Sequence, residues 1–511
     1  MKKISLIFLA LCLCLGACLM PMMASATALQ DTTAPADTTV PEETTASPAA
    51  PVVQGSAITE GDASVTHGAA SLEGQKPLGG SIKRLETAKA ALLYELNTGT
   101  LLYIWNPDAR MHPASLVKVM TAMVALEVGS LADPVTITSA MLSQLTSLDL
   151  FTNFKEGEQL TLGDLVHSCM VTSSNAASAL IAIHISGSEA SFVSKMNARA
   201  KELGCTDTNF VNSHGIPHDS QYTTARDMAR ILEAALQSEE FRQVFGAETY
   251  TIPATNLSEE KELVTTNYFL TKRGISKFYD SRVTGGKSGA ASTQDRSIVF
   301  TAQSGELNLL GVVMGAEGET GADGSTLRHN GSFEEATVLM NYGFDSFTTA
   351  QILFSGKSLA QFQVENSAND IVGRPVSSVS SALPAGTTLE HLSWQYVLDD
   401  SLTAPVKKGD VIGAIQVWCG DVCVAQSEMV SMNGARLTDA MQAESDRLAA
   451  NEDEKDNDGF TQFLMVIGIL LGAALVLGAL LMILVWTRAA IAQSRSRTRS
   501  RRRRQSRRRS R

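Results

Sequence analysis

The sequence predicts an α/β domain, followed by a small all-β domain and one membrane-spanning helix near the C-terminus. Two strand-like runs within 90–105 precede a helical middle, and two more follow within 297–314. This order indicates one sheet closed by strands from both ends of the domain. After about Phe347 the pattern changes to short alternating runs, which are typical of β structure. The run from Phe463 to Trp486 has 24 residues without a charge, enough to cross a bilayer.

The first 26 residues have the features of a secretory signal peptide. Lys2 and Lys3 precede an apolar run, and the small-residue cleavage site Ala24–Ala26 follows it. A lipoprotein signal is an open alternative, because Leu15–Cys18 resembles a lipobox. Residues 27–80 are rich in Thr, Pro, Ala and Ser. They contain too few apolar side chains to form a core, so they are predicted to be a disordered linker.

Residues 81–346 are predicted to form the first folded domain, which would be catalytic. Asn97–Gly99 is a hairpin turn signal between its first two strands. An apolar-periodic helix is expected over Leu116–Val128, with Ser115 at its N-terminus. Further helices are expected at 162–169, 176–185, 190–203, 224–237 and 333–342.

The C-terminal third is predicted to hold the β-rich domain (347–435), an acidic stalk (436–461) and the membrane helix (462–487). The tail 488–511 contains twelve arginines and no acid. Short basic flanks of this kind stay in the cytoplasm. The sequence therefore predicts a single-pass protein of the cell membrane, with an extracytoplasmic catalytic domain and a cytoplasmic C-terminus.

The chain has a net charge of −11, although twelve of its basic residues lie in the C-terminal tail. The exported part is therefore strongly acidic, which argues against nucleic acid as a partner. Cys169 and Cys205 are expected to be buried, whereas Cys419 and Cys423 flank a predicted hairpin turn where a disulfide could form. No His/Cys spacing resembles a zinc site and no glycine-rich loop suits a phosphate, so neither a metal nor a cofactor is expected.

Three short signatures occur in a fixed order, and the first is Ser115-Leu-Val-Lys118. Residues i and i+3 share one face of a helix, so the Lys118 amine should lie near the Ser115 hydroxyl. A serine is a weak nucleophile until a base takes its proton. Burial and a nearby cation, for which Lys287 is the candidate, could keep Lys118 neutral part of the time near pH 7.

The other two signatures are Ser173-Ser-Asn175 and Lys287-Ser288-Gly289. In an extended loop Ser173 and Asn175 would point the same way, so that the hydroxyl could relay a proton and the amide could hold a substrate carbonyl. An ammonium and a hydroxyl side by side, from Lys287 and Ser288, suit a substrate carboxylate. Gly289 would let an extended substrate lie against a strand edge.

Each signature has a structural explanation when it is taken alone. Ser115 could cap one helix, and Ser173 or Asn175 could cap the next. Lys287–Gly289 could be an ordinary turn. The three together, in this order and in one exported domain, favour acyl transfer through a serine ester.

Several longer segments resemble the serine D-alanyl-D-alanine carboxypeptidases, which are low-molecular-mass penicillin-binding proteins. They are Pro113–Ala122, Asn212–Gly215 and Tyr222–Ala229, and the β-rich part is similar to that family's C-terminal domain at Ala404–Gly409. The resemblance implies a β-lactamase/transpeptidase-like catalytic domain. It also implies two kinds of ligand, namely peptidoglycan stem peptides ending in D-Ala-D-Ala and β-lactam antibiotics.

The resemblance implies roles for individual residues. Ser115 would form the acyl-enzyme, Lys118 would accept its proton, and Ser173 would relay a proton to the leaving amine. The backbone N–H of Ala290 would complete an oxyanion hole with that of Ser115. The residues implied to bind substrate are Asn175, Lys287, Ser288, Gly289 and Ala290, whereas His214 and Gly215 are expected to be structural.

Two positions and one longer stretch depart from the usual pattern of the family. Ser288 stands in place of threonine, and Ala176 stands where an aspartate commonly follows the asparagine. The stretch after Gly289, Ala-Ala-Ser-Thr-Gln-Asp-Arg, lacks the Ala-Gly pair that is usual in the family.

Two other functions remain as alternatives. A class A β-lactamase would need a Glu-x-x-Leu-Asn loop between Asn175 and Lys287, and this sequence contains none there. A catalytically weak penicillin-binding sensor or scaffold would explain the unusual stretch after Gly289.

Overall fold

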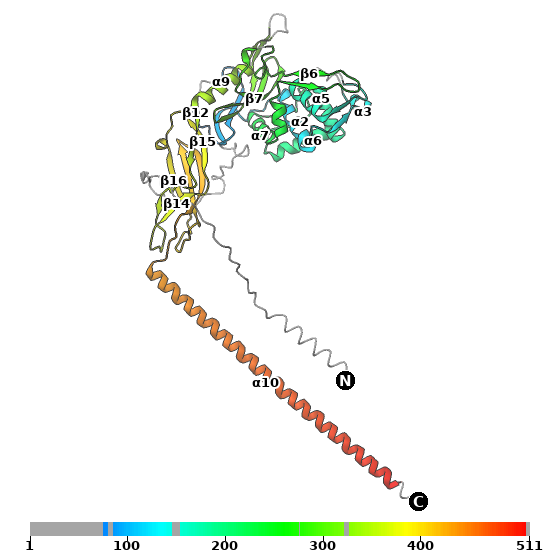
Figure 1. Ribbon diagram of the computed structural model, residues 1–511, viewed down its shortest axis with the longest axis vertical. Helices are drawn as coiled ribbons and strands as arrows, with labels where there is room; N and C mark the ends of the chain where they lie inside the picture. Colours follow the sequence, from blue (N-terminus) through cyan, green and yellow to red (C-terminus); the bar gives the residue numbers. More distant parts are fainter. Residues whose placement is uncertain (1–74, 80–84, 146–153, 275, 321–326, 507–511) are drawn as a thin grey trace, which may run out of the picture. The chain divides into compact units, whose positions relative to one another are not determined.

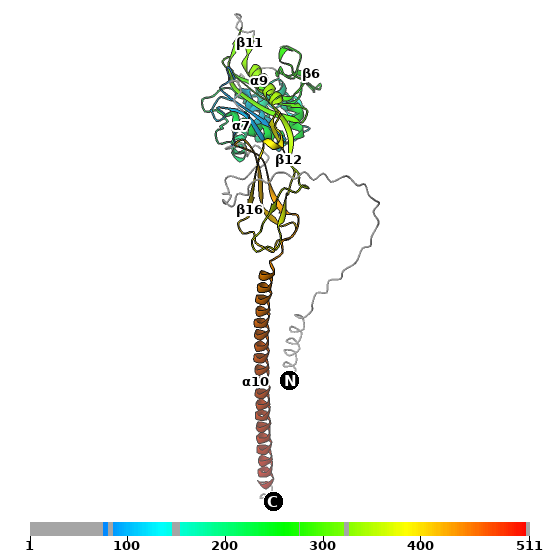
Figure 2. The ribbon, with the colours of Figure 1, turned by 90° about the vertical axis from the view of Figure 1, so that its left-hand side faces the viewer.

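The computed structural model describes residues 75–79, 85–145, 154–274, 276–320 and 327–506 (Figure 1, Figure 2). The predicted signal peptide and nearly all of the predicted linker lie outside these residues. The described chain contains the predicted α/β domain, the all-β domain and a long C-terminal helix.

A five-stranded antiparallel sheet forms the centre of the first domain, in the order β2-β1-β9-β8-β7. The N-terminal β1 pairs with β9 along its whole length, which confirms that strands from both ends of the domain close the sheet. β7 is an edge strand. The strands are β1 (Ala90–Glu95), β2 (Thr100–Trp105), β7 (Val283–Ser292), β8 (Asp295–Ser304) and β9 (Leu307–Ala316).

Helices cover both faces of this sheet. Alternate residues of β1 and β8 separate two cores, with Leu92 and Val299 on one face and Leu93 and Ile298 on the other. α9 (Gly331–Ser346) packs on the second face. The helices on the first face are α2 (Val117–Val128), α4 (Leu162–Val171), α5 (Asn175–Ser186), α6 (Glu189–Glu202), α7 (Ala225–Ala235) and α8 (Glu239–Phe245).

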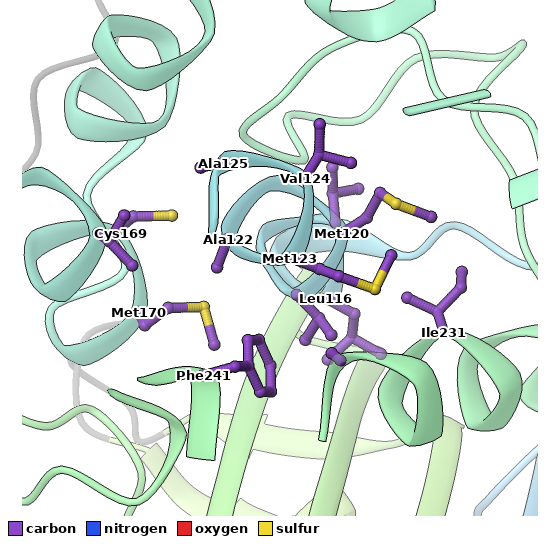
Figure 3. Packing of buried hydrophobic residues seen from close by; sticks show 14 of the residues in the cluster. Leu116, Met120, Ala122, Met123, Val124, Ala125, Cys169, Met170, Ile231 and Phe241 are labelled. Carbon is purple, nitrogen blue, oxygen red and sulfur yellow. The ribbon is translucent and has the colours of Figure 1, made fainter. Parts of the chain in front are cut away.

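α2 is the central helix of the first face. It contacts α4, α5, α6, α7 and α8, and its residues from Val117 to Ala125 are all buried. Figure 3 shows this helix end-on, with Cys169 and Met170 of α4, Ile231 of α7 and Phe241 of α8 packed around it. A helix that is apolar on all sides belongs inside a core. α2 therefore gives the signature Ser115-x-x-Lys118 a rigid base.

The sequence did not predict several short elements of this domain. Three two-stranded antiparallel sheets pair β3 with β4, β5 with β6, and β10 with β11. Runs of three or four residues carry too little periodicity to be recognised in sequence. These elements are β3 (Pro134–Thr136), β4 (Gln159–Thr161), β5 (Thr249–Ile252), β6 (Lys261–Val264), β10 (Gly318–Thr320), β11 (Leu327–Asn330), α3 (Ser139–Leu142) and the turn η3 (Ser276–Phe278).

The β-rich domain consists of one five-stranded sheet, β13-β14-β18-β17-β16, and the pair β12-β15. A tight turn at Gly420, with φ of +63°, joins β17 to β18 as a hairpin. Cys419 and Cys423 on its two sides are free thiols in this structure. The elements are β12 (Phe347–Leu353), β13 (Gln361–Phe362), β14 (Ile371–Pro375), β15 (Val379–Pro384), η4 (Leu389–His391), β16 (Ser393–Leu398), β17 (Val411–Cys419) and β18 (Val422–Ser431).

One long helix, α10 (Asp439–Ser506), follows the β-rich domain. It contains the predicted stalk, the predicted membrane helix and most of the arginine-rich tail. The part Gln462–Arg488 is long and apolar enough to cross a membrane, and it is one candidate span by length and composition.

Candidate active site

Ser115 and Lys118 lie at the start of the central helix. Ser115 belongs to the short 3₁₀ turn η2 (Ala114–Leu116), which leads directly into α2. The Lys118 Nζ donates a hydrogen bond to the Ser115 Oγ over 3.2 Å. Ser115 is half-buried, whereas Lys118 is fully buried. The hydroxyl therefore borders solvent and the amine lies beneath it.

Two further acceptors fix the Lys118 amine. Its Nζ donates to the Asn175 Oδ1 over 2.8 Å and to the carbonyl oxygen of His214. Burial lowers the pKa of Lys118 to about 7, and the charge of Lys287 adds to the effect. A lysine with this pKa is neutral about half of the time at neutral pH, as a general base must be.

Ser173 and Asn175 do not lie in an extended loop, so that expectation is wrong. Ser173 has a left-handed backbone with φ of +60°, and Asn175 is the first residue of α5. Ser174 caps this helix, because its Oγ accepts a hydrogen bond from the Ala177 N–H. The turn at Ser173 nevertheless directs its hydroxyl to Lys287, while Asn175 contacts Lys118.

Lys287, Ser288 and Gly289 lie within the edge strand β7 and do not form a turn. The Lys287 Nζ donates to the Ser173 Oγ over 2.9 Å and to the Ser288 carbonyl over 3.1 Å. Burial lowers the pKa of Lys287 to about 8. Within the described residues, the Ser288 hydroxyl makes no hydrogen bond to the protein, and Ala290 is exposed further along the strand.

Two glycines let the backbones around Ser115 approach closely. A Cβ on Gly289 would lie 2.8 Å from the Ser115 backbone nitrogen. A Cβ on Gly215, whose φ is +89°, would lie 2.0 Å from the Ala114 carbonyl oxygen. Ala114 itself has a left-handed φ of +47°. Strained backbone of this kind is typical of functional sites. Gly289 thus brings the edge strand against the Ser115 N–H, which differs from the role expected from the sequence.

A supporting group that the sequence did not reveal is Glu189, the first residue of α6. Its Oε1 accepts hydrogen bonds from the Ser213 backbone N–H over 2.9 Å and from the Ser213 Oγ over 2.7 Å. It also lies 3.5 Å from the His214 Nε2. Glu189 thereby holds the loop whose His214 carbonyl accepts from Lys118. Acidic residues are common in the first turn of a helix, so the sequence around Glu189 did not indicate this contact.

His214 is in the neutral state within this loop. Its Nδ1 accepts a hydrogen bond from the Ile216 N–H over 3.2 Å, so the proton lies on Nε2. Burial lowers the pKa of His214 to about 4, and the charge of Lys118 acts in the same direction against that of Glu189. These contacts agree with a structural role for His214.

Comparison with known proteins identifies the family. Residues 81–318 match the family of the D-alanyl-D-alanine carboxypeptidases, and residues 347–435 match the C-terminal domain of penicillin-binding protein 5. The first folded domain belongs to the D-alanyl-D-alanine carboxypeptidase family. It is therefore a serine peptidase, which confirms the expected enzyme class.

Curated relatives cover most of the same residues. The chain is 29% identical over 335 residues to D-alanyl-D-alanine carboxypeptidase DacF of Bacillus subtilis, a match covering 64% of this chain and 80% of the relative. It is also 29% identical over 355 residues to DacA of Escherichia coli, covering 67% of this chain and 82% of the relative. Both relatives are named D-alanyl-D-alanine carboxypeptidases.

Solved structures share the fold. Penicillin-binding protein 5 of Haemophilus influenzae superposes with a TM-score of 0.55 at 29% identity, covering 70% of this chain and 100% of that one. The carboxypeptidase DacD of Francisella tularensis gives a TM-score of 0.55 at 20% identity, covering 70% and 97% of the two chains. The predicted fold class is therefore confirmed, with a penicillin-binding-protein catalytic fold before the β-rich domain.

The contacts of Glu189 lead to a prediction about this carboxypeptidase family member. We expect Glu189→Ala to lower kcat/KM for D-alanine release by about tenfold, because two buried donors lose a charged acceptor and the His214 carbonyl is held less firmly. Glu189→Gln keeps an acceptor oxygen and should stay closer to the wild type. The matched control is Glu202→Ala, at the exposed end of the same helix. Wild-type kinetics in Glu189→Ala would contradict the positioning role.

Proposed function

We propose that the protein removes the terminal D-alanine from peptidoglycan stem peptides that end in D-Ala-D-Ala, through an acyl-enzyme on Ser115. The observation that carries this proposal is the buried Lys118 amine, 3.2 Å from the Ser115 hydroxyl and with its pKa lowered to about 7. The family assignment supplies the substrate class. The same serine would be acylated by β-lactam antibiotics, whose strained amide takes the place of the peptide bond.

In the acylation step, Lys118 takes the Ser115 proton as the Oγ attacks the carbonyl carbon between the two D-alanines. The C–N bond breaks, and the leaving amine receives the proton that Lys118 took, relayed through the Ser173 hydroxyl, which is hydrogen-bonded to Lys287. Lys118 is then neutral again. The backbone N–H groups of Ser115 and Ala290 would stabilise the oxyanion. The close approach of Gly289 to the Ser115 nitrogen supports this pairing.

In the deacylation step, Lys118 takes a proton from water, and the resulting hydroxide attacks the ester. The ester C–O bond breaks and the proton returns to the Ser115 Oγ. Asn175 would hold the acyl carbonyl region while its Oδ1 keeps Lys118 in place. No step requires a metal or a cofactor.

The location proposed for this reaction is the outer face of the cytoplasmic membrane. The candidate span Gln462–Arg488 would anchor the chain, and the arginines after it would remain inside the cell. The predicted signal peptide would direct the folded domains outward. An enzyme with this topology would reach peptidoglycan without leaving the membrane.

The test of the proposed function is release of D-alanine from an N-acylated L-Lys-D-Ala-D-Ala peptide by the purified full-length protein in detergent. We expect stoichiometric D-alanine and the shortened peptide. Rapid hydrolysis of penicillin with many turnovers would instead indicate a β-lactamase. Stable penicillin binding without any peptide turnover would indicate a sensor or scaffold.

The two lysines predict a bell-shaped pH dependence of kcat/KM. Activity should rise as the pH passes about 7, because Lys118 must lose its proton to act as the base. It should fall above about 8, because Lys287 loses the charge with which it polarises Ser173. Lys287→Arg cannot lose its proton and should remove the falling limb. A flat profile from pH 6 to about 9.5 would contradict these roles.

A further inference from the structure

The last part of α10 carries a high concentration of positive charge. Residues 488–511, called here the arginine-rich segment, contain twelve arginines and no acid, and the helix continues through this segment to Ser506. Figure 1 shows α10 as one uninterrupted helix. Without these twelve charges, the net charge of the chain would change from −11 to −23. The segment therefore differs in charge from everything that precedes it.

The spacing along the helix separates most of these arginines from a membrane surface. Arg488 is the last residue of the candidate span, and residues 489–494 carry no charge. At a rise of about 1.5 Å per residue, Arg495 lies about 10 Å beyond Arg488 and Arg504 lies about 24 Å beyond it. Attraction to anionic lipid falls off within a Debye length, about 8 Å at physiological ionic strength. A helix that continues in the direction of the span therefore holds most of its arginines out of reach of its own membrane.

The arginines also occur on two sides of the helix. One set is spaced by four and then three residues, which places it along one face, and a second set with the same spacing begins two residues later. Because successive residues are about 100° apart around a helix, the second face is nearly opposite to the first. The two sets are Arg495, Arg499 and Arg502, and Arg497, Arg501 and Arg504. A flat lipid surface meets only one side of a helix, whereas the major groove of duplex DNA admits a helix between two rows of phosphates.

The composition of the arginine-rich segment suits the phosphates of a duplex. A guanidinium can bind a phosphate through two parallel hydrogen bonds. The segment contains no aromatic residue, on which the bases of a single strand would stack. Its only amide side chains are those of Gln493 and Gln505, and contacts to phosphate carry no sequence information. These features favour a duplex over a single strand and predict binding without sequence preference.

We propose that the arginine-rich segment binds duplex DNA in the cytoplasm through its phosphates. Continuous basic helices lie in the major groove in other DNA-binding proteins. This proposal rests on the topology proposed above, in which the segment remains inside the cell, and it is independent of the chemistry at Ser115. The enzyme would thereby connect the site of peptidoglycan trimming on one side of the membrane to DNA on the other side.

The first test measures the affinity of a fluorescent DNA duplex of about 20 base pairs for the full-length protein in nanodiscs of uncharged phosphatidylcholine. At about 150 mM salt we expect a Kd of about 1 µM or below. Between about 50 and 200 mM salt the affinity should fall about 10³-fold or more, because arginines that bind phosphates release counterions. A Kd above about 100 µM at 150 mM salt, or an affinity that does not depend on salt, would overturn the proposal.

The test variant combines Arg501→Gln, Arg502→Gln, Arg503→Gln and Arg504→Gln. We expect its affinity for the duplex to fall about tenfold or more, and the slope of log affinity against log salt to decrease by about four. The matched control replaces four exposed cations of the folded domains and should bind as the wild type does. Its changes are Lys261→Gln, Arg273→Gln, Lys407→Gln and Lys408→Gln. Equal affinity of the test variant and the wild type would contradict binding by this segment.

A competition experiment distinguishes DNA from lipid. Vesicles of phosphatidylglycerol, added at the same concentration of phosphate charge, should displace only a minor part of the bound duplex. Complete displacement would assign the segment to the anionic membrane and overturn the proposal.

Crosslinking tests the proposal in living cells. Formaldehyde treatment followed by purification should recover DNA with the wild-type protein and much less with the test variant, and equal recovery would overturn the proposal. D-alanine release should be the same for the wild type and both variants. Loss of DNA binding alone therefore leaves the proposed function standing, and absence of D-alanine release alone leaves this proposal standing.

Discussion

Ser115→Ala should abolish D-alanine release, lowering turnover on the order of 10⁴-fold or more, because no other group can form the acyl bond. The fold should survive, since Ser115 is half-buried and its hydroxyl contacts Lys118 at the start of α2. Release of D-alanine is measured with excess enzyme over several hours, and circular dichroism checks the fold.

The matched control for this variant is Ser139→Ala, an exposed serine at the start of α3. It should keep the wild-type rate. If Ser115→Ala retained measurable multiple turnover, the nucleophile would have to be another residue, and the proposed mechanism would be wrong.

Lys118→Arg should reduce kcat by about 10²- to 10⁴-fold, the usual range for loss of a general base. Arginine keeps the positive charge but cannot give up its proton near neutral pH. The larger head group must also fit a fully buried site that holds Asn175 and the His214 carbonyl. The activity of Lys118→Arg should not recover at high pH. The activity of an enzyme with a lysine of raised pKa at this position would recover.

The control for Lys118→Arg is Lys201→Arg on the exposed surface of α6. It should behave as the wild type at every pH. Recovery of Lys118→Arg activity above pH 9 would show that residue 118 is not the base.

The sequence was sufficient for the parts of the site that depend on local geometry. Helical spacing predicted that Lys118 reaches Ser115, and both lie at the start of one helix. The strand pattern likewise anticipated the main sheet, whose core positions alternate strictly along β1 and β8. Long, periodic segments specify their own structure, and these were found within a few residues of their observed ends.

The sequence was insufficient where a contact joins distant segments. Glu189 meets Ser213 across 24 positions of the chain, and no pattern links them. Ser173 adopts a left-handed backbone that only the surrounding packing can impose. The face of the sheet on which Arg296 lies depends on strand register, because a one-residue slip would place it on the opposite face.

The structure shows where the residues that depart from the usual family pattern lie and what they contact. Ser288 keeps the hydroxyl that its position requires. Ala176 lies buried in the first turn of α5, where its methyl group needs no hydrogen-bond partner. The stretch after Gly289 forms an antiparallel hairpin whose register shifts between Ala290 and Ser292, beyond the part of the edge strand that borders Ser115.

The most direct test of the central claim is mass spectrometry of the full-length protein after reaction with benzylpenicillin. Trypsin should release the peptide Met111–Lys118, in which Ser115 is the only serine. We expect this peptide to carry the mass of one intact penicillin, and Ser115→Ala to carry none. A covalent adduct on any other peptide, or no adduct on the wild type, would contradict an acyl-enzyme at Ser115.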